Sequence, residues 1–490
     1  MRDLHLTRTL SALVAAAHGC ARPRATHALR ATLLLPLCLA AACSARGEAR
    51  TQAARACLDA ESGESAAHAA LQRSQRGASA TPNDANAWVT TGEVWLRVAR
   101  TYARPELFSA ADDCAERALG LEAHAPAALR LRAMSALNAH RFADARAIAQ
   151  KLLDRDANDV LSWAITSDAE LELGNLEAAT EAVQQMLDRE PGLAAYGRAA
   201  HLAWLRGERA SAKRLYRAAI EAGRHLRDPE PRLWMLVQAA WVFWHEGDYA
   251  GARDGFALAL KGLPEYAPAL EGLGRAQLSA AASGSGRARA DSASAGLAPG
   301  VQGQTPAPLG AAASAEVRGD RAGYVEAART LERALAVHPL PETAWWLGDA
   351  YAALGDSTRA QAAYARVEAL AERSDPRTLS LFYATQDRKH RAALRLAQRA
   401  YRERQDWYAK DALAFALYRN GKLREALPLA RELLATSVPD ARLLYHAGLI
   451  LRAAGDAAVG GEAMRRALSI NPRFDLRLTG ALHDTTFASR

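Results

Sequence analysis

The side chains with the clearest chemical potential are aromatic and lie close together near the middle of the chain. Trp234, Trp241, Trp244 and His245 are separated by intervals that bring side chains to one side of a helix. Indole and imidazole rings stack on flat or apolar groups, so these residues could hold an apolar side chain or the ring of a ligand. The alternative is that this stripe packs in a hydrophobic core, as tryptophans at helical spacing commonly do.

Residue patterns that carry enzyme chemistry were not found. The sequence contains no H-E-x-x-H, no G-x-S-x-G, no Walker phosphate loop and no paired CxxC. The 13 histidines are scattered singly, and the Asp and Glu residues are expected mostly on solvated helix faces. We therefore expect no catalytic residues, no metal site and no cofactor.

Composition and charge narrow the class of protein further. Of the 490 residues, 50% are hydrophobic and only 6% are aromatic, and the abundance of alanine favours close-packed helices over sheets. The net charge is +8, which becomes +4 without residues 1–42, because that segment holds five arginines and one aspartate. Such a dilute excess does not form the clustered basic face that phosphate binding needs, so we do not expect nucleic acid as a partner.

The N-terminal region has the pattern of a secretory signal. Arg30 precedes an apolar run at 33–39, and Ala40 to Ala42 lead into Cys43. The segment 39–43 resembles a bacterial lipobox, in which Cys43 becomes the lipidated first residue. We expect a signal peptide at 1–42 and a lipidated, partly disordered spacer at 43–84. The alternative is a cytoplasmic protein with an alanine-rich head.

The rest of the chain is periodic. Six glycines each end one helical pattern and begin another, with small residues seven positions before and five positions after them: Gly174, Gly207, Gly247, Gly355, Gly421 and Gly455. A glycine in the left-handed conformation closes the first helix, and small side chains let the two helix backbones approach where they cross. The periodicity predicts a series of tight helix-turn-helix units.

This spacing resembles the tetratricopeptide repeat family, best in the unit that contains Ala240, Gly247 and Ala252 and in the unit that contains Gly348 and Gly355. The resemblance implies an all-α fold, a right-handed α-solenoid (superhelix) of about ten repeats. We expect the units to begin near Ala85, Pro126, Val160, Leu193, Leu233, Ala267, Pro341, Pro376, Trp407 and Ala441.

An insertion divides the array. Residues 281–316 are mainly Ala, Ser, Gly and Pro, a composition that cannot bury enough surface to offset the entropy of ordering. We expect a disordered loop there, between an N-terminal array at 85–280 and a C-terminal array at 317–474, with a C-terminal tail at 475–490. A loop between two helices of one unit can extend outward without interrupting the stack.

The resemblance also implies which residues face the concave groove, namely unit positions 2, 5, 9, 12 and 13. The aromatic residues at such positions give a predicted partner-binding groove: Trp204, Trp234, Trp241, Trp244, His245, Trp345 and Tyr418. Trp204, Trp234, Trp241 and Trp244 would form an apolar clamp for a peptide or helix, unless they serve as core.

These observations favour a non-enzymatic interaction scaffold, exported and lipid-anchored in the bacterial cell envelope and facing the periplasm. It would bind a protein or peptide partner, in support of envelope complex assembly. Two alternatives stay open: a cytoplasmic adaptor or co-chaperone, and a periplasmic binder of a glycan or other small ligand. The sequence leaves open whether Cys57 and Cys114 form a disulfide.

Overall fold

The computed structural model describes residues 52–61, 63, 65–102, 104–295 and 320–479, and within these ranges the regular elements are helices and none is a strand. The predicted signal peptide and Cys43 lie outside the described residues. No helix within these ranges is both long and apolar enough to span a membrane. The chain is thus an all-α protein, as the sequence predicts.

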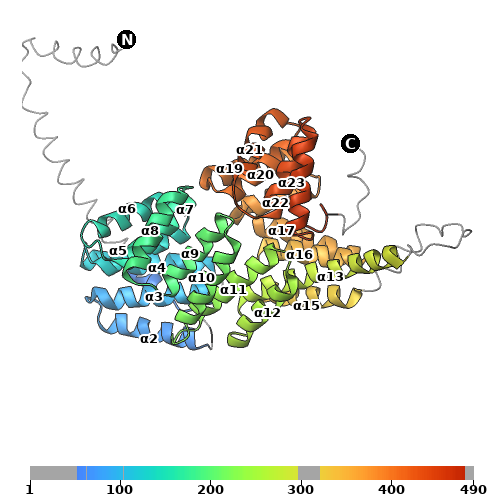
Figure 1. The fold of residues 1–490 in the computed structure, drawn as a ribbon. Coiled ribbons are helices and arrows are strands. Elements are labelled where there is room, and N and C mark those ends of the chain that lie inside the picture. Colours follow the sequence, from blue (N-terminus) through green and yellow to red (C-terminus); the bar gives the residue numbers. More distant parts are fainter. Residues whose placement is uncertain (1–51, 62, 64, 103, 296–319, 480–490) are drawn as a thin grey trace, which may run out of the picture.

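Ten helical hairpins follow one another, preceded by α2 (Ala66–Ala80) (Figure 1). The first five are α3 (Ala85–Thr101) and α4 (Phe108–Leu121), α5 (Pro126–Asn138) and α6 (Phe142–Leu153), α7 (Val160–Glu172) and α8 (Leu176–Arg189), α9 (Leu193–Leu205) and α10 (Arg209–Ala222), α11 (Glu230–His245) and α12 (Tyr249–Gly262). The second five are α13 (Ala267–Ala295) and α15 (Arg321–Val337), α16 (Pro341–Ala353) and α17 (Ser357–Ser374), α18 (Pro376–Thr385) and α19 (His390–Glu403), α20 (Trp407–Arg419) and α21 (Leu423–Ala435), α22 (Ala441–Ala453) and α23 (Ala457–Ile470).

The helices that open these hairpins begin at the predicted residues in every unit but one. Helix α11 begins at Glu230 rather than near Leu233. Pro229 and Pro231 flank its first residue, and proline is well tolerated in the first turn of a helix, where its missing N–H is not needed. The helix therefore starts one turn earlier than the apolar pattern indicates.

The turns and crossings have the predicted geometry. The six glycines that end the first helices all have positive φ, between 72° and 94°. A Cβ placed on Gly348 would lie 2.2 Å from the Tyr364 ring, and one placed on Gly448 would lie 2.7 Å from the carbonyl oxygen of Gly460. The small residues therefore permit the close approach of paired helices that makes the array an α-solenoid.

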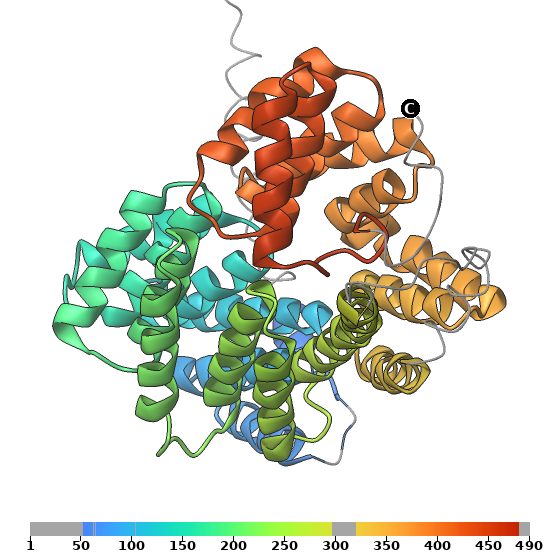
Figure 2. The ribbon, with the colours of Figure 1, turned by 45° about the vertical axis from the view of Figure 1, so that its right-hand side comes forward.

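The solenoid folds back so that its last hairpins contact the third to fifth hairpins, a feature that the sequence did not predict. A Cβ placed on Gly207 would lie 2.6 Å from the carbonyl oxygen of Ser437, and one on Gly247 would lie 3.0 Å from that of Ile470. One hairpin earlier, Arg404 forms an ion pair of 2.5 Å with Glu172. In Figure 2 the helices near the C-terminus accordingly lie next to those near the middle of the chain.

We call these contacts between the last hairpins and the middle of the array the closure of the solenoid. The segment after α23 adds to them. Tyr249 donates a hydrogen bond from its hydroxyl to Asn471 Oδ1 (2.6 Å), and Asn471 Nδ2 donates to the carbonyl of Trp244 (2.8 Å). Phe474 and Leu476 are buried. The first residues of the predicted C-terminal tail, 475–479, therefore pack against the array, with Leu476 buried.

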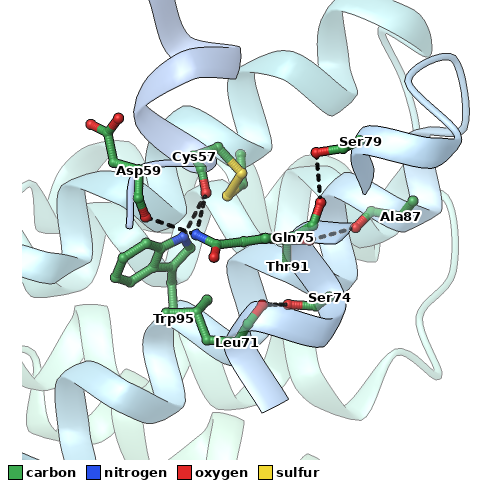
Figure 3. Close-up of a disulfide and its surroundings, with 10 residues drawn as sticks. Cys57, Asp59, Leu71, Ser74, Gln75, Ser79, Ala87, Thr91 and Trp95 are labelled. Atoms are coloured by element: carbon green, nitrogen blue, oxygen red, sulfur yellow. Dashed lines mark hydrogen bonds between the residues drawn. A yellow bond between two sulfur atoms is a disulfide. The ribbon is translucent and has the colours of Figure 1, made fainter. Parts of the chain in front are cut away.

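The N-terminal spacer is also more ordered than predicted. Residues 52–57 are helical, α2 packs on α3, and Leu71 is fully buried. Cys57 and Cys114 form a disulfide, and Trp95 Nε1 donates a 2.9 Å hydrogen bond to the carbonyl of Cys57 (Figure 3). This segment is rich in alanine, the best helix former, which favours the helices observed.

The insertion begins later than predicted, because α13 continues to Ala295. Residues 296–319 lie outside the described residues. The two helices that flank them pair as one unit: a Cβ placed on Gly274 of α13 would lie 2.7 Å from the Leu331 side chain of α15. The inserted segment therefore leaves the stacking of this hairpin intact.

Candidate functional site

A cavity of about 250 Å³ lies between the first helices of the fifth to tenth hairpins. Helices α11, α13, α16, α18, α20 and α22 and the segment after α23 contribute to its wall. Its lining residues are Trp241, Trp244, His245, Arg275, Glu342, Trp345, Trp346, Asp349, Arg377, Thr378, Leu381, Tyr408, Asp440, Arg442, Phe474 and Asp475. Because the first helix of each unit faces the concave side of a solenoid, the cavity is the part of the groove that closure encloses.

Aromatic rings form one wall of the cavity. The Trp241 ring meets the Trp244 ring edge to face at 5.5 Å and lies 6.0 Å from the Trp346 ring. Trp244 is buried, and its Nε1 donates a 3.0 Å hydrogen bond to Ser279 Oγ. Trp241 and Trp346 are only partly buried. Their exposed surfaces are the apolar faces that a ligand could contact.

Arg275 is held against this wall and is only 4% exposed. Its guanidinium carbon lies 5.1 Å from the centroid of Trp244 and 5.4 Å from that of Trp346, so two indoles contact the cation. One of its nitrogens, Nη2, donates to the carbonyl of Phe474. Burial lowers the pKa of Arg275, and the nearby carboxylate of Asp349 opposes that effect.

Asp349 is a second buried charged residue of the cavity lining. It is buried and accepts a 2.8 Å hydrogen bond from the Tyr364 hydroxyl. Burial and the neighbouring carboxylate of Asp475 raise the pKa of Asp349 to about 7, against the attraction of Arg477 and Arg275. A proton on this carboxyl group is therefore gained or lost near neutral pH.

A second polar group lies beside His245. Its Nδ1 is 3.6 Å from Asp440 Oδ2, and Asp440 also caps α22 by accepting from the backbone N–H of Arg442 at 2.8 Å. Burial lowers the pKa of His245, so the imidazole is neutral at pH 7 and the contact is polar rather than ionic. The centroid of the Trp204 ring lies 5.3 Å from that of the His245 ring, so the two rings are in contact.

The structure brings together four of the seven residues of the predicted groove, since Trp241, Trp244, His245 and Trp345 line the cavity. The other three lie elsewhere. Trp204 is buried behind His245, Trp234 is 41% exposed on α11 away from the cavity wall, and Tyr418 stacks on Phe415 at 6.2 Å. Of the four tryptophans of the predicted clamp, Trp241 and Trp244 thus line the cavity, whereas Trp204 is buried behind it and Trp234 lies outside it.

The sequence prediction missed the charged lining. Arg275 and Asp349 directly follow Gly274 and Gly348, the small residues of their units, and so occupy position 9, which was expected to face the groove. Position 2 of later units supplies three further charged lining residues: Glu342, Arg377 and Arg442. The same rule applied to charged as well as aromatic residues would have found them. Within the described ranges no group of three or more His, Cys, Asp or Glu side chains is placed to hold a metal ion.

Comparison with known families finds one repeat. Residues 341–373 match the family model described as "Tetratricopeptide repeat". This segment is therefore similar to a tetratricopeptide repeat. It comprises α16 and most of α17 and contributes Glu342, Trp345 and Asp349 to the cavity. A search of curated proteins found no match.

Several solved structures of helical-repeat proteins are similar in fold. PilW, described as a widely conserved type IV pilus biogenesis factor, is 13% identical over 51% of this chain and 95% of its own, with a TM-score of 0.37. An IFIT1 mutant bound to m7Gppp-AAAA is 14% identical over 86% of this chain and 94% of its own (TM-score 0.46). A Rap protein complexed with Competence and Sporulation Factor is 12% identical over 70% and 97% (TM-score 0.39). At these values, nothing about those proteins' ligands transfers to this chain.

Proposed function

We propose that this protein is a non-enzymatic scaffold that binds a peptide or protein partner on the concave side of its solenoid. Tetratricopeptide-type helical repeats generally serve protein–protein interaction. The observation that carries the proposal is the cavity itself, where partly exposed rings of Trp241, Trp346 and Tyr408 stand on three different first helices. Burying one large aromatic side chain of a partner against such rings would contribute about 1.5 to 3 kcal/mol.

The charge of the cavity favours a protein over a nucleic acid as the partner. Three arginines line it, against four acidic residues: Glu342, Asp349, Asp440 and Asp475. A surface of this balance does not neutralise a row of phosphates. We therefore keep nucleic acid outside the proposal.

We propose further that the protein is exported and anchored through a lipid on Cys43, at a bacterial membrane facing the periplasm. The Cys57–Cys114 disulfide supports this, because disulfides persist in oxidising compartments such as the periplasm. Labelling cells with a radioactive fatty acid tests the anchor. Label that disappears in Cys43→Ala is the expected result, and an unlabelled wild-type protein would rule the anchor out.

Partner binding is tested by pull-down from envelope extracts with variants that leave the fold intact. Trp241→Ala and Tyr408→Ala remove partly exposed rings of the cavity, whereas Trp234→Ala removes a ring of similar kind outside it. The partner should be lost with the first two variants and retained with the third, at unchanged melting temperatures. Retention in all three would contradict the proposed site.

A further inference from the structure

The segment that follows α23, Asn471–Thr479, belongs to no helix of the array. We call this segment the strap. At its start the Tyr249 hydroxyl of α12 donates a 2.6 Å hydrogen bond to Asn471 Oδ1. Near its end Arg477 Nη2 donates to the Tyr364 hydroxyl of α17 at 3.3 Å. The strap therefore connects helices that are far apart in the sequence, and it forms part of the cavity wall.

The array binds the backbone of the strap through three side chains. Arg275 Nη2 donates to the carbonyl of Phe474, and the Tyr445 hydroxyl donates to that of Leu478 at 3.1 Å. The Tyr249 hydroxyl accepts a backbone N–H of the strap at 3.1 Å. Every peptide offers such carbonyl groups, and every residue except proline offers the N–H. The same three side chains could therefore bind the backbone of another segment in this place.

Two apolar side chains of the strap are buried. Phe474 is 6% exposed, with its ring centroid 5.4 Å from that of Tyr445, and Leu476 is 1% exposed. The charged residues that alternate with them, Asp475 and Arg477, are only partly buried. A segment that occupies this place thus needs an aromatic side chain and, two positions later, an aliphatic one.

The strap can leave without opening a hairpin, because α22 and α23 pair with each other and with α21 and not through the strap. The burial of its two apolar side chains opposes the entropy lost by ordering the whole segment. Segments with few buried apolar contacts open locally at a lower free energy than the helices on which they lie. Phe474 belongs to the same apolar cluster as Trp244 and Leu444, so its release would uncover surface for another apolar side chain.

We propose that the strap is an internal ligand of the groove, and that a short, non-helical segment of the partner displaces it. The partner segment would carry an aromatic and an aliphatic side chain in the places of Phe474 and Leu476. Its backbone would bind Arg275, Tyr249 and Tyr445 in turn. The inference rests on the proposed function, because it concerns the same groove, and it adds that partner binding requires release of the strap.

Amide hydrogen exchange of the wild-type full chain tests whether the strap opens by itself. The backbone N–H groups of Arg473 and Leu478, which bond to Tyr249 and Asp475, should exchange at least tenfold faster than those in the middle of α22. A common rate for the strap and α22 would mean that the strap leaves only when the last hairpins unfold, and it would overturn the proposal.

A labelled synthetic peptide with the sequence of residues 471–479 tests whether the groove recognises the strap as a ligand. It should bind the release variant Phe474→Ala/Leu476→Ala at least tenfold more tightly than the wild type, with one peptide per chain. The matched control, Leu468→Ala/Val459→Ala, changes two exposed residues of α23 and should behave as the wild type. Equal affinity for the release variant and the wild type, or no binding to either, would overturn the proposal.

The same peptide with alanine in place of its phenylalanine and leucine should not bind the release variant. Binding of this alanine peptide would contradict the role of the two buried side chains. Adding Tyr445→Phe to the release variant removes the hydroxyl that donates to the Leu478 carbonyl, and should weaken binding of the unchanged peptide at least threefold. Unchanged affinity would contradict recognition of the backbone.

Partner capture from envelope extracts separates this inference from the proposed function. The release variant should capture at least threefold more partner than the wild type, and excess strap peptide should reduce that capture. A release variant that binds the peptide but captures no partner would refute the scaffold function and uphold the strap as an internal ligand. Capture that excess peptide does not reduce would refute displacement of the strap and uphold the scaffold function.

Discussion

Replacing one turn glycine tests the closure of the solenoid, because a matched control exists in the same fold. Gly207 and Gly355 both end a first helix with nearly equal φ angles of 77° and 76°. A Cβ on Gly207 would lie 2.6 Å from the Ser437 carbonyl oxygen, whereas a Cβ on Gly355 would meet no heavy atom within 4 Å. The two substitutions therefore share the backbone strain and differ in the closure contact.

The expected magnitudes follow from this difference. Alanine in the left-handed region costs about 1 to 2 kcal/mol at either position. Gly207→Ala additionally forces two backbone segments apart, which adds about 1 to 3 kcal/mol if they are tightly packed. Gly207→Ala should thus reduce the free energy of unfolding by about 2 to 5 kcal/mol, and Gly355→Ala by about 1 to 2 kcal/mol.

Urea unfolding followed by circular dichroism measures both losses. Amide hydrogen exchange identifies where each variant opens, since protection is lost first where contacts are weakened. Gly207→Ala should speed exchange around residue 437, which is 230 positions away in sequence, and Gly355→Ala should not. Equal losses of stability, with no change in exchange at that loop, would refute the closure.

Three other predictions follow from the site and its supports. Asp349 has a pKa of about 7 in the fold against an ordinary value of 3.8, so the folded state binds a proton that the unfolded state has released between these values; stability from this group should fall by about 2 to 3 kcal/mol from pH 5 to pH 8. Asp349→Asn should abolish this pH-dependent part of the stability, measured by urea unfolding at the two pH values. The other titratable or charged groups that face Asp349 are Asp475, Tyr364, Arg477 and Arg275. An unchanged pH dependence in the variant would contradict the assignment of the titration to Asp349. Trp244→Ala should lower the free energy of unfolding by about 3 to 5 kcal/mol, since the ring is 7% exposed, while Trp234→Ala should lower it by less than about 1 kcal/mol; similar losses would show that the burial of the two rings is misassigned. Reducing the Cys57–Cys114 disulfide, whose cysteines are 57 positions apart, should destabilise the N-terminal hairpins by about 4 kcal/mol, measured by proteolysis of the segment before α3, and two free thiols at these cysteines in the isolated oxidised protein would refute the pairing.

The sequence predicted those features of the fold that depend on nearby residues. Gly348 and Tyr364 contact each other within one hairpin, so their spacing alone indicates the crossing. The contact of Gly207 with Ser437 depends on the small rotation between successive hairpins, summed over the whole array. No short sequence pattern specifies the total rotation over many hairpins, so the closure was not predicted.

The candidate site was predicted in part for the same reason. Trp241 and Trp345 fall on groove positions of single units, and both line the cavity. Trp204 also falls on such a position, yet the fold buries it behind His245. Phe474 and Asp475 belong to a segment that was expected to end the array, and only the closure brings them to the cavity wall.

Site-specific photo-crosslinking tests most directly whether the concave side binds the partner. A benzoylphenylalanine in place of Glu342, a partly exposed cavity residue, should yield one specific adduct in cells, identifiable by mass spectrometry. The same group in place of Val459, which is 49% exposed on α23, serves as the control on a surface away from the cavity. An adduct from position 342 that is absent at position 459 and abolished by Trp241→Ala is the predicted result, and an adduct formed only at position 459 would contradict binding in the cavity.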